Sequence, residues 1–218
     1  LPYDTIKDFT PITNLIESPL VVVVNPDVRA NTLAEFVALA KANPGKLNYG
    51  SAGVGNTLHL AGETFRMATG TDLVHVPYKG ASQALGDLLG GRIQVMFDLP
   101  QTPLSNIQGG KLRALALTGS ERLSLLPGVP TTAEAGLPSF TFGTWIGLVA
   151  PAGTPAAVIN RLHAEIVKAA TQAEVKEAFA KMAMLVATSA SPDAFAKKIQ
   201  GETERLAKVI RAAGIRPE

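Results

Sequence analysis

The sequence contains no cysteine among its 218 residues. This absence excludes disulfide bonds, a thiol nucleophile and cysteine-ligated metal sites. The longest aliphatic run, Leu20–Val24, is far shorter than the ~20 residues that a membrane-spanning helix needs. The three histidines, His59, His75 and His163, show none of the spacings typical of metal sites, so we expect neither a bound metal nor a cofactor.

Charge is scarce as well. Charged residues make up 17% of the chain, and 20 Lys+Arg against 18 Asp+Glu leave a net charge of +2. Nucleic-acid-binding proteins usually carry a basic run or stripe, and because none is visible we expect no nucleic-acid partner. Hydrophobic residues reach 46%, which excludes a disordered chain, and the length suffices for one large domain or two lobes.

Short β-rich runs alternate with helical windows over the first half of the chain. Helix boundaries are marked by capping residues such as Thr32, with Glu35 three positions later, and by glycines such as Gly70. Such alternation predicts an α/β fold with a mainly parallel sheet. The expected strands are 20–24, 46–49, 73–77, 93–97 and 112–118.

The composition changes near Phe140. Beyond it we expect one strand over 144–149, followed by helices that begin near Thr154, Glu174 and Ser191. Thr154-Pro155 and Ser191-Pro192 each combine an N-cap hydroxyl with a proline at the first helical position. The helical last third of the chain is therefore expected to belong to a second lobe.

The sharpest local feature is a glycine-rich loop, Gly50–Thr57, between a strand and a helix. Glycines allow a tight turn and a close backbone approach to a ligand, and the N–H groups of the helix start favour an anion. Ser51, Asn56 and Thr57 add neutral donors. The simplest alternative is a connecting turn with a capping hydroxyl.

Three enzyme or nucleotide interpretations of the same loop compete with these. A phosphate-binding P-loop requires a lysine where Asn56 stands. A dinucleotide fingerprint requires the glycine order G-x-G-x-x-G, and this loop has the reverse order. A serine hydrolase could combine Ser51, His59 and Asp98, but the glycine expected two residues before the nucleophile is replaced by Tyr49.

Two further strand ends carry polar residues. Tyr78–Ser82 follows the strand over 73–77 and opens a helix, so Lys79 either faces an anion there or is solvated, and Ser82 either binds the ligand or caps the helix. Asp98 follows the strand over 93–97 and either caps the next helix or accepts a hydrogen bond from a ligand. In open parallel sheets, ligands bind beyond the carboxyl ends of the strands, where these loops lie.

Several ordered segments together resemble the solute-binding proteins of tripartite tricarboxylate transporters, the TctC or Bug family. The segments are Phe9–Thr13, Leu47–Gly55, His59–Glu63, Val76–Gly80 and Leu148–Pro155. The resemblance implies a non-enzymatic periplasmic protein with a type II periplasmic-binding-protein fold. It implies two α/β lobes that hold a small carboxylate between them for delivery to a membrane permease.

Carried onto this sequence, the resemblance implies a complete α/β lobe over residues 17–138, the second lobe, and a partial first lobe over 1–16 and 139–218. It also implies a set of ligand-binding residues in the two loops, with Asp98 and Thr144 as additional candidates. The loop residues are Ser51, Gly53, Gly55, Asn56, Thr57, Lys79, Gly80, Ala81 and Ser82.

One departure from the family pattern concerns the N-terminus. The family's mature chain normally carries about one more βαβ-sized block before the segment that begins at Leu1. We expect no signal peptide, because the first residues show no basic segment followed by an apolar one. We therefore expect an incomplete first lobe whose exposed sheet edge and apolar faces are covered by a second copy in a homodimer. The alternative is a truncated relative with lost or altered ligand binding, acting as a sensor or interaction protein.

Overall fold

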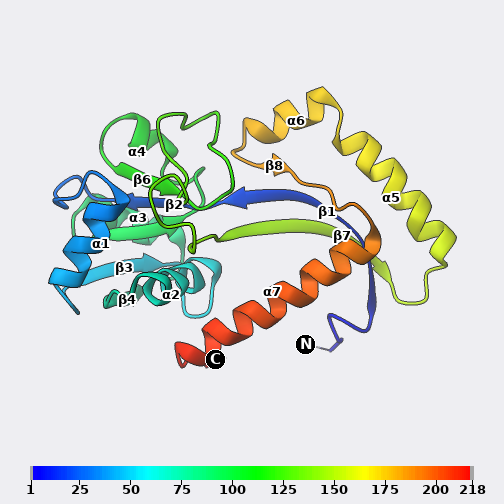
Figure 1. Cartoon of the computed structure of the whole chain (residues 1–218), viewed down its shortest axis with the longest axis horizontal. Coiled ribbons are helices and arrows are strands. Elements are labelled where there is room, and N and C mark those ends of the chain that lie inside the picture. Colours follow the sequence, from blue (N-terminus) through cyan, green and yellow to red (C-terminus); the bar gives the residue numbers. More distant parts are fainter. Residues whose placement is uncertain (1, 217–218) are drawn as a thin grey trace. The chain divides into compact units, whose positions relative to one another are not determined.

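The computed structural model describes residues 2–216, which divide into two compact units (Figure 1). Unit 1 comprises the residues up to Ser18 together with Thr144–Arg205. Unit 2 comprises Pro19–Gly143 together with the residues from Leu206 onward. The chain thus passes between the units three times, after Ser18, after Gly143 and after Arg205. None of the helices in residues 2–216 is long and apolar enough to cross a membrane.

Unit 2 contains a five-stranded sheet with the order β4-β3-β5-β2-β6. Each strand expected from the sequence over residues 20–118 is present, and a helix follows four of them. The strands are β2 (Val21–Val24), β3 (Leu47–Ser51), β4 (Leu73–Pro77), β5 (Val95–Asp98) and β6 (Arg113–Leu117). The helices are α1 (Leu33–Ala42), α2 (Thr57–Thr69), α3 (Ala81–Leu89) and α4 (Leu104–Gln108).

The direction of β2 differs from the expected parallel pattern. β3 pairs in parallel with β4 and β5, whereas β2 runs antiparallel to both of its neighbours, β5 and β6. Parallel neighbours need a crossover connection, and β2 is instead reached directly from β1 (Phe9–Pro19). The four valines of β2 are fully buried. Their apolar run in the sequence predicted a central strand but carried no information about its direction.

Aromatic side chains fill the core of unit 2 on the α2 side of the sheet. The Phe65 ring lies 5.0 Å from the Phe97 ring and 5.3 Å from the Phe140 ring. The C-terminal part of α7 (Pro192–Ala212) joins this core through Val209, which is only 5% exposed. The sequence placed all of 139–218 in the first lobe, whereas this burial places the residues from Leu206 onward in unit 2.

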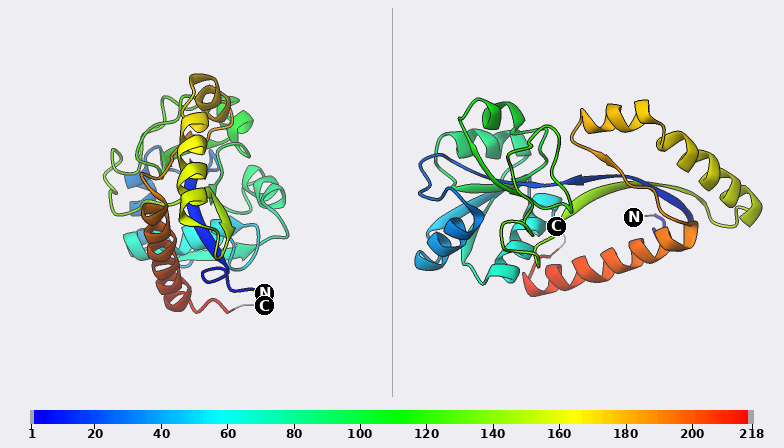
Figure 2. Two further views of the ribbon diagram at one scale, coloured as in Figure 1. Left: turned by 90° about the vertical axis from the view of Figure 1, so that its right-hand side faces the viewer. Right: turned by 45° about the horizontal axis from the view of Figure 1, so that its top comes forward.

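Unit 1 contains a three-stranded sheet with the order β7-β1-β8. The strands other than β1 are β7 (Gly143–Pro151) and β8 (Leu185–Val186), and the helices are α5 (Ala156–Ala170), α6 (Ala173–Ala180) and the first part of α7. α5 and α6 lie over one face of this sheet and α7 over the other (Figures 1 and 2). On the α7 face, the Trp145 ring packs edge-on against Phe195 at 5.5 Å.

The predicted helix starts are mostly confirmed. Thr32 accepts the Glu35 N–H at the start of α1, and Ser191 accepts the Ala194 N–H at the start of α7. Thr154 is the exception. α5 begins one residue later than predicted, with Pro155 at its N-cap, because the Thr154 hydroxyl donates instead to the carbonyl of Pro151.

Candidate functional site

The carboxyl ends of β3, β4 and β5 meet at one edge of the unit 2 sheet. Ser51 ends β3 and lies in register with Pro77, which ends β4. The Tyr78 N–H donates to the Ser51 carbonyl at 3.0 Å, so the two predicted loops converge. Together they line a surface hollow. Its lining residues are Ala52, Gly53, Val54, Pro77, Tyr78, Lys79 and Gln83.

The first loop needs its glycines. Gly53 and Gly55 have φ angles of 128° and 75°, which side-chain-bearing residues rarely adopt. A Cβ atom at Gly53 would also lie 3.5 Å from the Tyr78 carbonyl oxygen of the second loop. Asn56 is the N-cap of α2, where its side-chain oxygen accepts the His59 N–H at 3.0 Å. The side chain that caps α2 is therefore the amide of Asn56 and not a hydroxyl, so Asn56 has a local structural role.

The second loop opens α3 without a side-chain cap. Gly80 is the N-cap in an extended conformation, and the backbone N–H groups of Ala81 and Ser82 have no acceptor within residues 2–216. Ser82 is exposed at the second helical position, so of its two alternatives the capping role is wrong. An uncapped helix start with free N–H groups favours an anion.

Lys79 supplies the positive charge beside this helix start. Its side chain is exposed and lines the hollow, and it forms no ion pair with the acidic residues that the structure describes. Its backbone N–H donates to the Gln83 side chain at 3.2 Å, which holds the loop against α3. The arrangement leaves the Lys79 ammonium available to an anion in the hollow.

Ser51 is fully buried, and its hydroxyl is used inside the protein. Its Oγ lies 2.6 Å from Nε2 of His75 and also accepts the Gly53 N–H at 3.2 Å. The Ser51, His59 and Asp98 triad considered from the sequence is therefore not formed, because the histidine that reaches Ser51 is His75. The Asp98 Oδ1 instead accepts the N–H of Leu99, its neighbour in the chain.

A buried polar cluster lies under the first loop. We call it the histidine cluster, and it consists of Tyr49, His59, Glu63, Arg66 and His75. The His59 and His75 rings stack in parallel with centroids 3.7 Å apart. Glu63 accepts hydrogen bonds from the Tyr49 hydroxyl at 2.5 Å and from Arg66 at 2.9 Å. Burial, followed by the neighbouring His59, lowers the pKa of His75 to about 4.

Asp98 ends β5 at the same edge of the sheet. It is 1% exposed and does not line the hollow, and its Oδ2 atom has no hydrogen-bond partner among the described residues. Burial raises the pKa of Asp98 to about 6. It does not cap α4, whose N-cap is Pro103 without a side-chain hydrogen bond. A carboxyl of this kind can donate a hydrogen bond when it is protonated.

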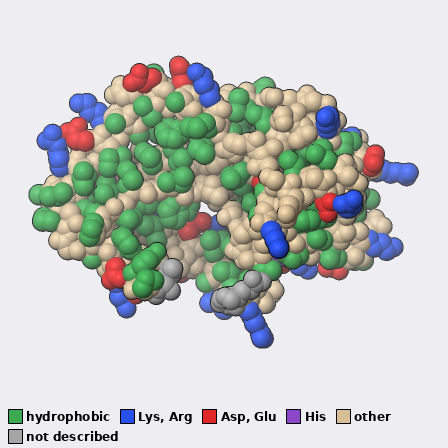
Figure 3. Space-filling model, turned by 180° about the vertical axis from the view of Figure 1, so that it is seen from behind, with side chains coloured by type: hydrophobic (Ala, Val, Ile, Leu, Met, Phe, Trp, Pro, Cys, Tyr) green, Lys and Arg blue, Asp and Glu red, His purple; other side chains and the backbone are tan. Residues whose placement is uncertain are grey.

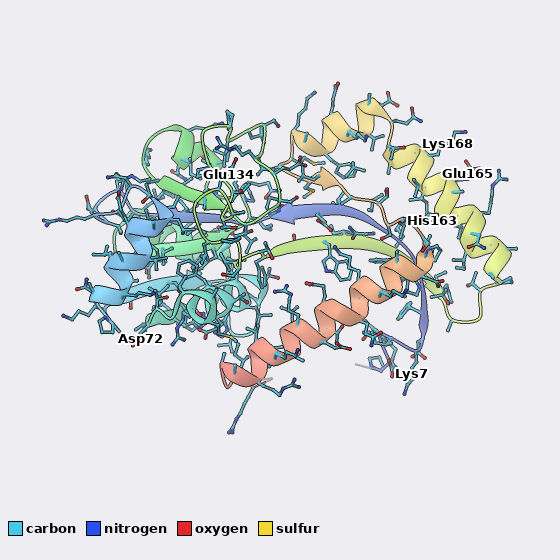
Figure 4. All side chains as sticks on the ribbon, in the orientation of Figure 1. Lys7, Asp72, Glu134, His163, Glu165 and Lys168 are labelled. Atoms are coloured by element: carbon cyan, nitrogen blue, oxygen red, sulfur yellow. The ribbon has the colours of Figure 1, made fainter. Side chains whose placement is uncertain are left out.

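The other candidates lie elsewhere. Thr144 lies near the start of β7 and belongs to unit 1, so it is not part of the loop pair. His163 lies on α5, also in unit 1, with its Nε2 3.0 Å from the Ser189 carbonyl oxygen (Figure 4). Within residues 2–216, no group of three or more His, Asp or Glu side chains is placed to hold a metal ion.

Sequence reasoning missed part of the hollow. Ala52, Val54 and Gln83 line it but were not among the predicted binding residues. Tyr78 also lines it, although its hydroxyl donates to Asp87 at 2.8 Å. Gln83 was detectable in principle, since it stands three residues after the N-cap Gly80, where a reciprocal capping side chain is common. The apolar lining residues carry no comparable signal.

Comparison with known proteins gives a consistent result. Residues 1–215 match the sequence model of a family described as "Tripartite tricarboxylate transporter family receptor" (TctC). A protein of Pseudomonas sp. strain P51, "UPF0065 protein in tcbD-tcbE intergenic region", is 41% identical over 211 residues, which cover 96% of this chain and 62% of that protein.

Solved structures show the same similarity. "R. palustris Rpa4515 with adipate" has a TM-score of 0.81 at 30% identity, covering 99% of this chain and 72% of that one. "MatC (Rpa3494) from Rhodopseudomonas palustris with bound malate" has a TM-score of 0.75 at 31% identity, covering 96% and 72%. A chain described as "Structure of a periplasmic transporter" has a TM-score of 0.79 at 43% identity, covering 99% and 72%.

The chain spans 62% of the length of the Pseudomonas relative. Almost all residues of this chain nevertheless superpose on these solved structures, which cover 99% of it. The predicted α/β fold of the type II periplasmic-binding-protein kind is therefore confirmed, and this chain covers 72% of the length of those structures.

Proposed function

Because the chain belongs to the tripartite tricarboxylate transporter receptor (TctC) family, whose members are solute-binding receptors rather than enzymes, we propose that it binds a small carboxylate at the paired loops of unit 2. The observation that carries this proposal is the convergence of two strand-to-helix loops on one hollow. Within residues 2–216, Thr57 of the first loop and Ala81 and Ser82 of the second keep backbone N–H groups without an acceptor.

The chemistry of the hollow fits an anion of modest size. Lys79 lines the hollow and supplies a full positive charge. The two helix starts that follow the loops add partial positive charge through backbone N–H groups. Neutral donors and a single lysine select charge and size more than detailed shape. The adipate and malate bound by two structural relatives make small dicarboxylates the first ligands to test.

Among the predicted binding residues, the structure supports direct roles for some and indirect roles for others. The N–H groups of Thr57, Ala81 and Ser82 and the ammonium of Lys79 are assigned to ligand contact in this proposal. Gly53, Gly55, Gly80, Asn56 and Ser51 are assigned to shaping the loops, because their polar groups are used within the protein or their role is a backbone conformation. Asp98 and Thr144 are not assigned to contact.

A thermal-shift panel tests the proposal. Adipate, malate, other mono- and dicarboxylates and amino acids are added singly, with Mg-ATP as the arm for the P-loop interpretation. A ligand that binds only the folded state raises the midpoint in proportion to the logarithm of its concentration. We expect at least one carboxylate to do so, and the shift to shrink in Lys79→Ala. The matched control is Lys46→Ala, an exposed lysine before β3. A panel in which no carboxylate shifts the midpoint contradicts the proposal.

The partner of the loaded receptor is, in this proposal, the membrane permease of a tripartite transporter, and its place of action is the periplasm. The family description and the periplasmic relatives support both statements. Coexpression with such a permease and uptake of the ligand identified by the panel tests this part. Uptake that does not depend on the chain counts against it.

We also propose that a second copy of the chain covers the open edge of the unit 1 sheet. In unit 2, β2 follows directly from unit 1 and is flanked by β6 on one side and β5, β3 and β4 on the other. In unit 1, β7 follows directly from unit 2 and is flanked by β1 on one side, with no strand of residues 2–216 on the other. If β7 is matched with β2 and β1 with β6, the open edge of β7 is the position at which the unit 2 sheet continues with β5, β3 and β4.

Exposed apolar side chains accompany this edge. Ile146 and Leu148 of β7 are 55% and 39% exposed, and hydrophobic side chains gather on a face of unit 1 (Figure 3). Open strand edges and apolar patches of this kind favour pairing with another chain. Self-association is the form that such pairing takes in a solution of the isolated chain.

A further inference from the structure

The geometry points to His59 and His75 as positioning residues that fasten the two sides of the first loop, Ser51–Gly55, from the α2 side of the sheet. This inference rests on the proposed function, because the loop matters as the frame of the carboxylate site. The two histidines touch no ligand in this account. They set the conformation in which the loop meets its neighbour and opens the helix start at Thr57.

His75 holds the strand end of the loop. It lies on β4 in register with Tyr49, two residues before Ser51 on β3, and its Nε2 lies 2.6 Å from the Ser51 hydroxyl. That hydroxyl is bound in turn to both backbone groups of Gly53, accepting its N–H at 3.2 Å and lying 3.0 Å from its carbonyl oxygen. His75 therefore fixes a three-residue turn through one side chain.

His59 holds the helix end of the loop. Its Nδ1 accepts the Gly55 N–H at 2.9 Å, which fixes the glycine in its left-handed conformation just before the helix cap Asn56. A ring nitrogen can accept only when it carries no proton. The Gly55 bond therefore requires a neutral His59 with its proton on Nε2, the nitrogen that faces Glu63 at 3.9 Å.

The surroundings favour the neutral form of both rings. The rings stack at 3.7 Å with an interplanar angle of 5°, an arrangement that repels two imidazolium charges. The titratable and charged groups that face the pair are Tyr49 of β3 and Glu63 and Arg66 of α2. Burial lowers the pKa of His59, and Glu63 only partly opposes it because the carboxylate is already bound to Arg66 and Tyr49.

The network also reaches the surface. Arg66 forms a second ion pair, at 3.3 Å, with the exposed Asp72 in the connection between α2 and β4 (Figure 4). The loop is thus connected through His59, Glu63 and Arg66 to Asp72, just beyond the C-terminal end of α2. This connection distinguishes a built support from a chance contact of two histidines.

Isosteric substitutions separate positioning from general stability. An asparagine side chain places an oxygen near the position of a histidine Nδ1, and a glutamine side chain reaches the position of Nε2. His59→Asn and His75→Gln thus keep the hydrogen bonds to the loop, whereas His59→Phe and His75→Phe keep a ring but remove the nitrogen that bonds to the loop. His59→Gln is a further variant, since its amide lies at the wrong position for Gly55.

We expect adipate binding, measured by calorimetry, to weaken about tenfold or more in both phenylalanine variants and in His59→Gln, because a backbone or hydroxyl partner is left unbound. Binding in His59→Asn and His75→Gln is expected to stay within about threefold of the wild type. If the phenylalanine variants do not fold, the affinities of His59→Asn and His59→Gln are compared instead, and the inference predicts weaker binding in His59→Gln. Equal affinities in that pair, and in the phenylalanine variants when they fold, overturn the inference.

A ligand-free readout keeps this test separate from that of the proposed function. Hydrogen exchange at the Gly55 amide is expected to accelerate in His59→Phe and His59→Gln but not in His59→Asn, whatever the chain binds. In the wild type, protonation of His59 should lower the protection factor of the same amide, and because burial lowers the pKa of His59 this response lies below the ordinary histidine range. His59→Asn should lose the response. Unchanged exchange at Gly55 in His59→Gln, or a pH response retained in His59→Asn, contradicts the inference even if carboxylate binding is confirmed.

Discussion

At the scale of single residues, the support beneath the site depends on close packing. Gly62 of α2 faces the fully buried Tyr49 ring, and a Cβ atom there would lie 2.2 Å from a ring carbon. We expect Gly62→Ala to displace Tyr49 and lower the free energy of unfolding by roughly 1–3 kcal/mol, measured by urea denaturation. The matched control is Gly86→Ala in α3, which has open space around it and should gain about 0.5–1 kcal/mol. Equal effects of the two substitutions would show that packing on Tyr49 is unimportant.

Asp98 gives a residue-scale prediction about pH. Burial raises its pKa to about 6 from the ordinary value of 3.8, so the folded state binds more protons than the unfolded state between these values. The stability that Asp98 contributes is therefore present below about pH 4 and lost as the pH rises through 6, by on the order of 3 kcal/mol. Urea denaturation from pH 4 to pH 7 should show this decline in the wild type relative to Asp98→Asn. Parallel profiles of the two proteins would contradict it.

At the scale of elements, the two helix starts can be altered without breaking the helices. Ala81 is the first residue of α3 and follows Gly80 in an extended conformation, and Thr57 follows Asn56 in the same way at the start of α2. A proline at the first helical position is favourable and removes one N–H group. We expect Ala81→Pro and Thr57→Pro to leave the free energy of unfolding nearly unchanged while weakening carboxylate binding several-fold, as measured by calorimetry. Unaltered affinity in both variants would show that these N–H groups do not bind the carboxylate.

The elements were also the most predictable part of the molecule. Capping residues such as Thr32 and apolar runs such as Val21–Val24 predicted most helices and strands, because these signals depend only on residues that are close in sequence. β1 and β8 were missed, since the first lacks a clear alternation and the second has two residues. The direction of β2 was missed because burial of a strand on both faces is the same in either direction.

The two loops of the candidate site were predictable, but the hydrogen bonds within them were not. The two loops could be found from glycines and polar residues at strand ends, since that chemistry is local. The partner of Ser51 could not, because His75 is 24 residues away in the sequence and reaches it only through the register of β3 with β4. Which polar groups remain available to a ligand depends on such long-range bonds.

At the scale of the whole molecule, the open edge of β7 predicts concentration-dependent self-association. Ile146→Lys places a charge on the exposed apolar face beside this edge, where it should hinder a second chain while leaving the folded unit intact. Light scattering is expected to show a dimer for the wild type and a monomer for the variant at equal concentration. The matched control is Val54→Lys, an exposed apolar position in unit 2, which should not change the wild-type mass. A wild type that is monomeric throughout would contradict the proposed covering of this edge.

The most direct test of carboxylate binding at the paired loops is a titration of the isotope-labelled chain with adipate and with malate, followed through its backbone amide resonances. The account predicts saturable shifts that are largest at Thr57, Ala81 and Ser82 and at the residues that flank them. Carboxylate binding that leaves these amides unchanged, or the absence of any shift at millimolar ligand, would contradict it.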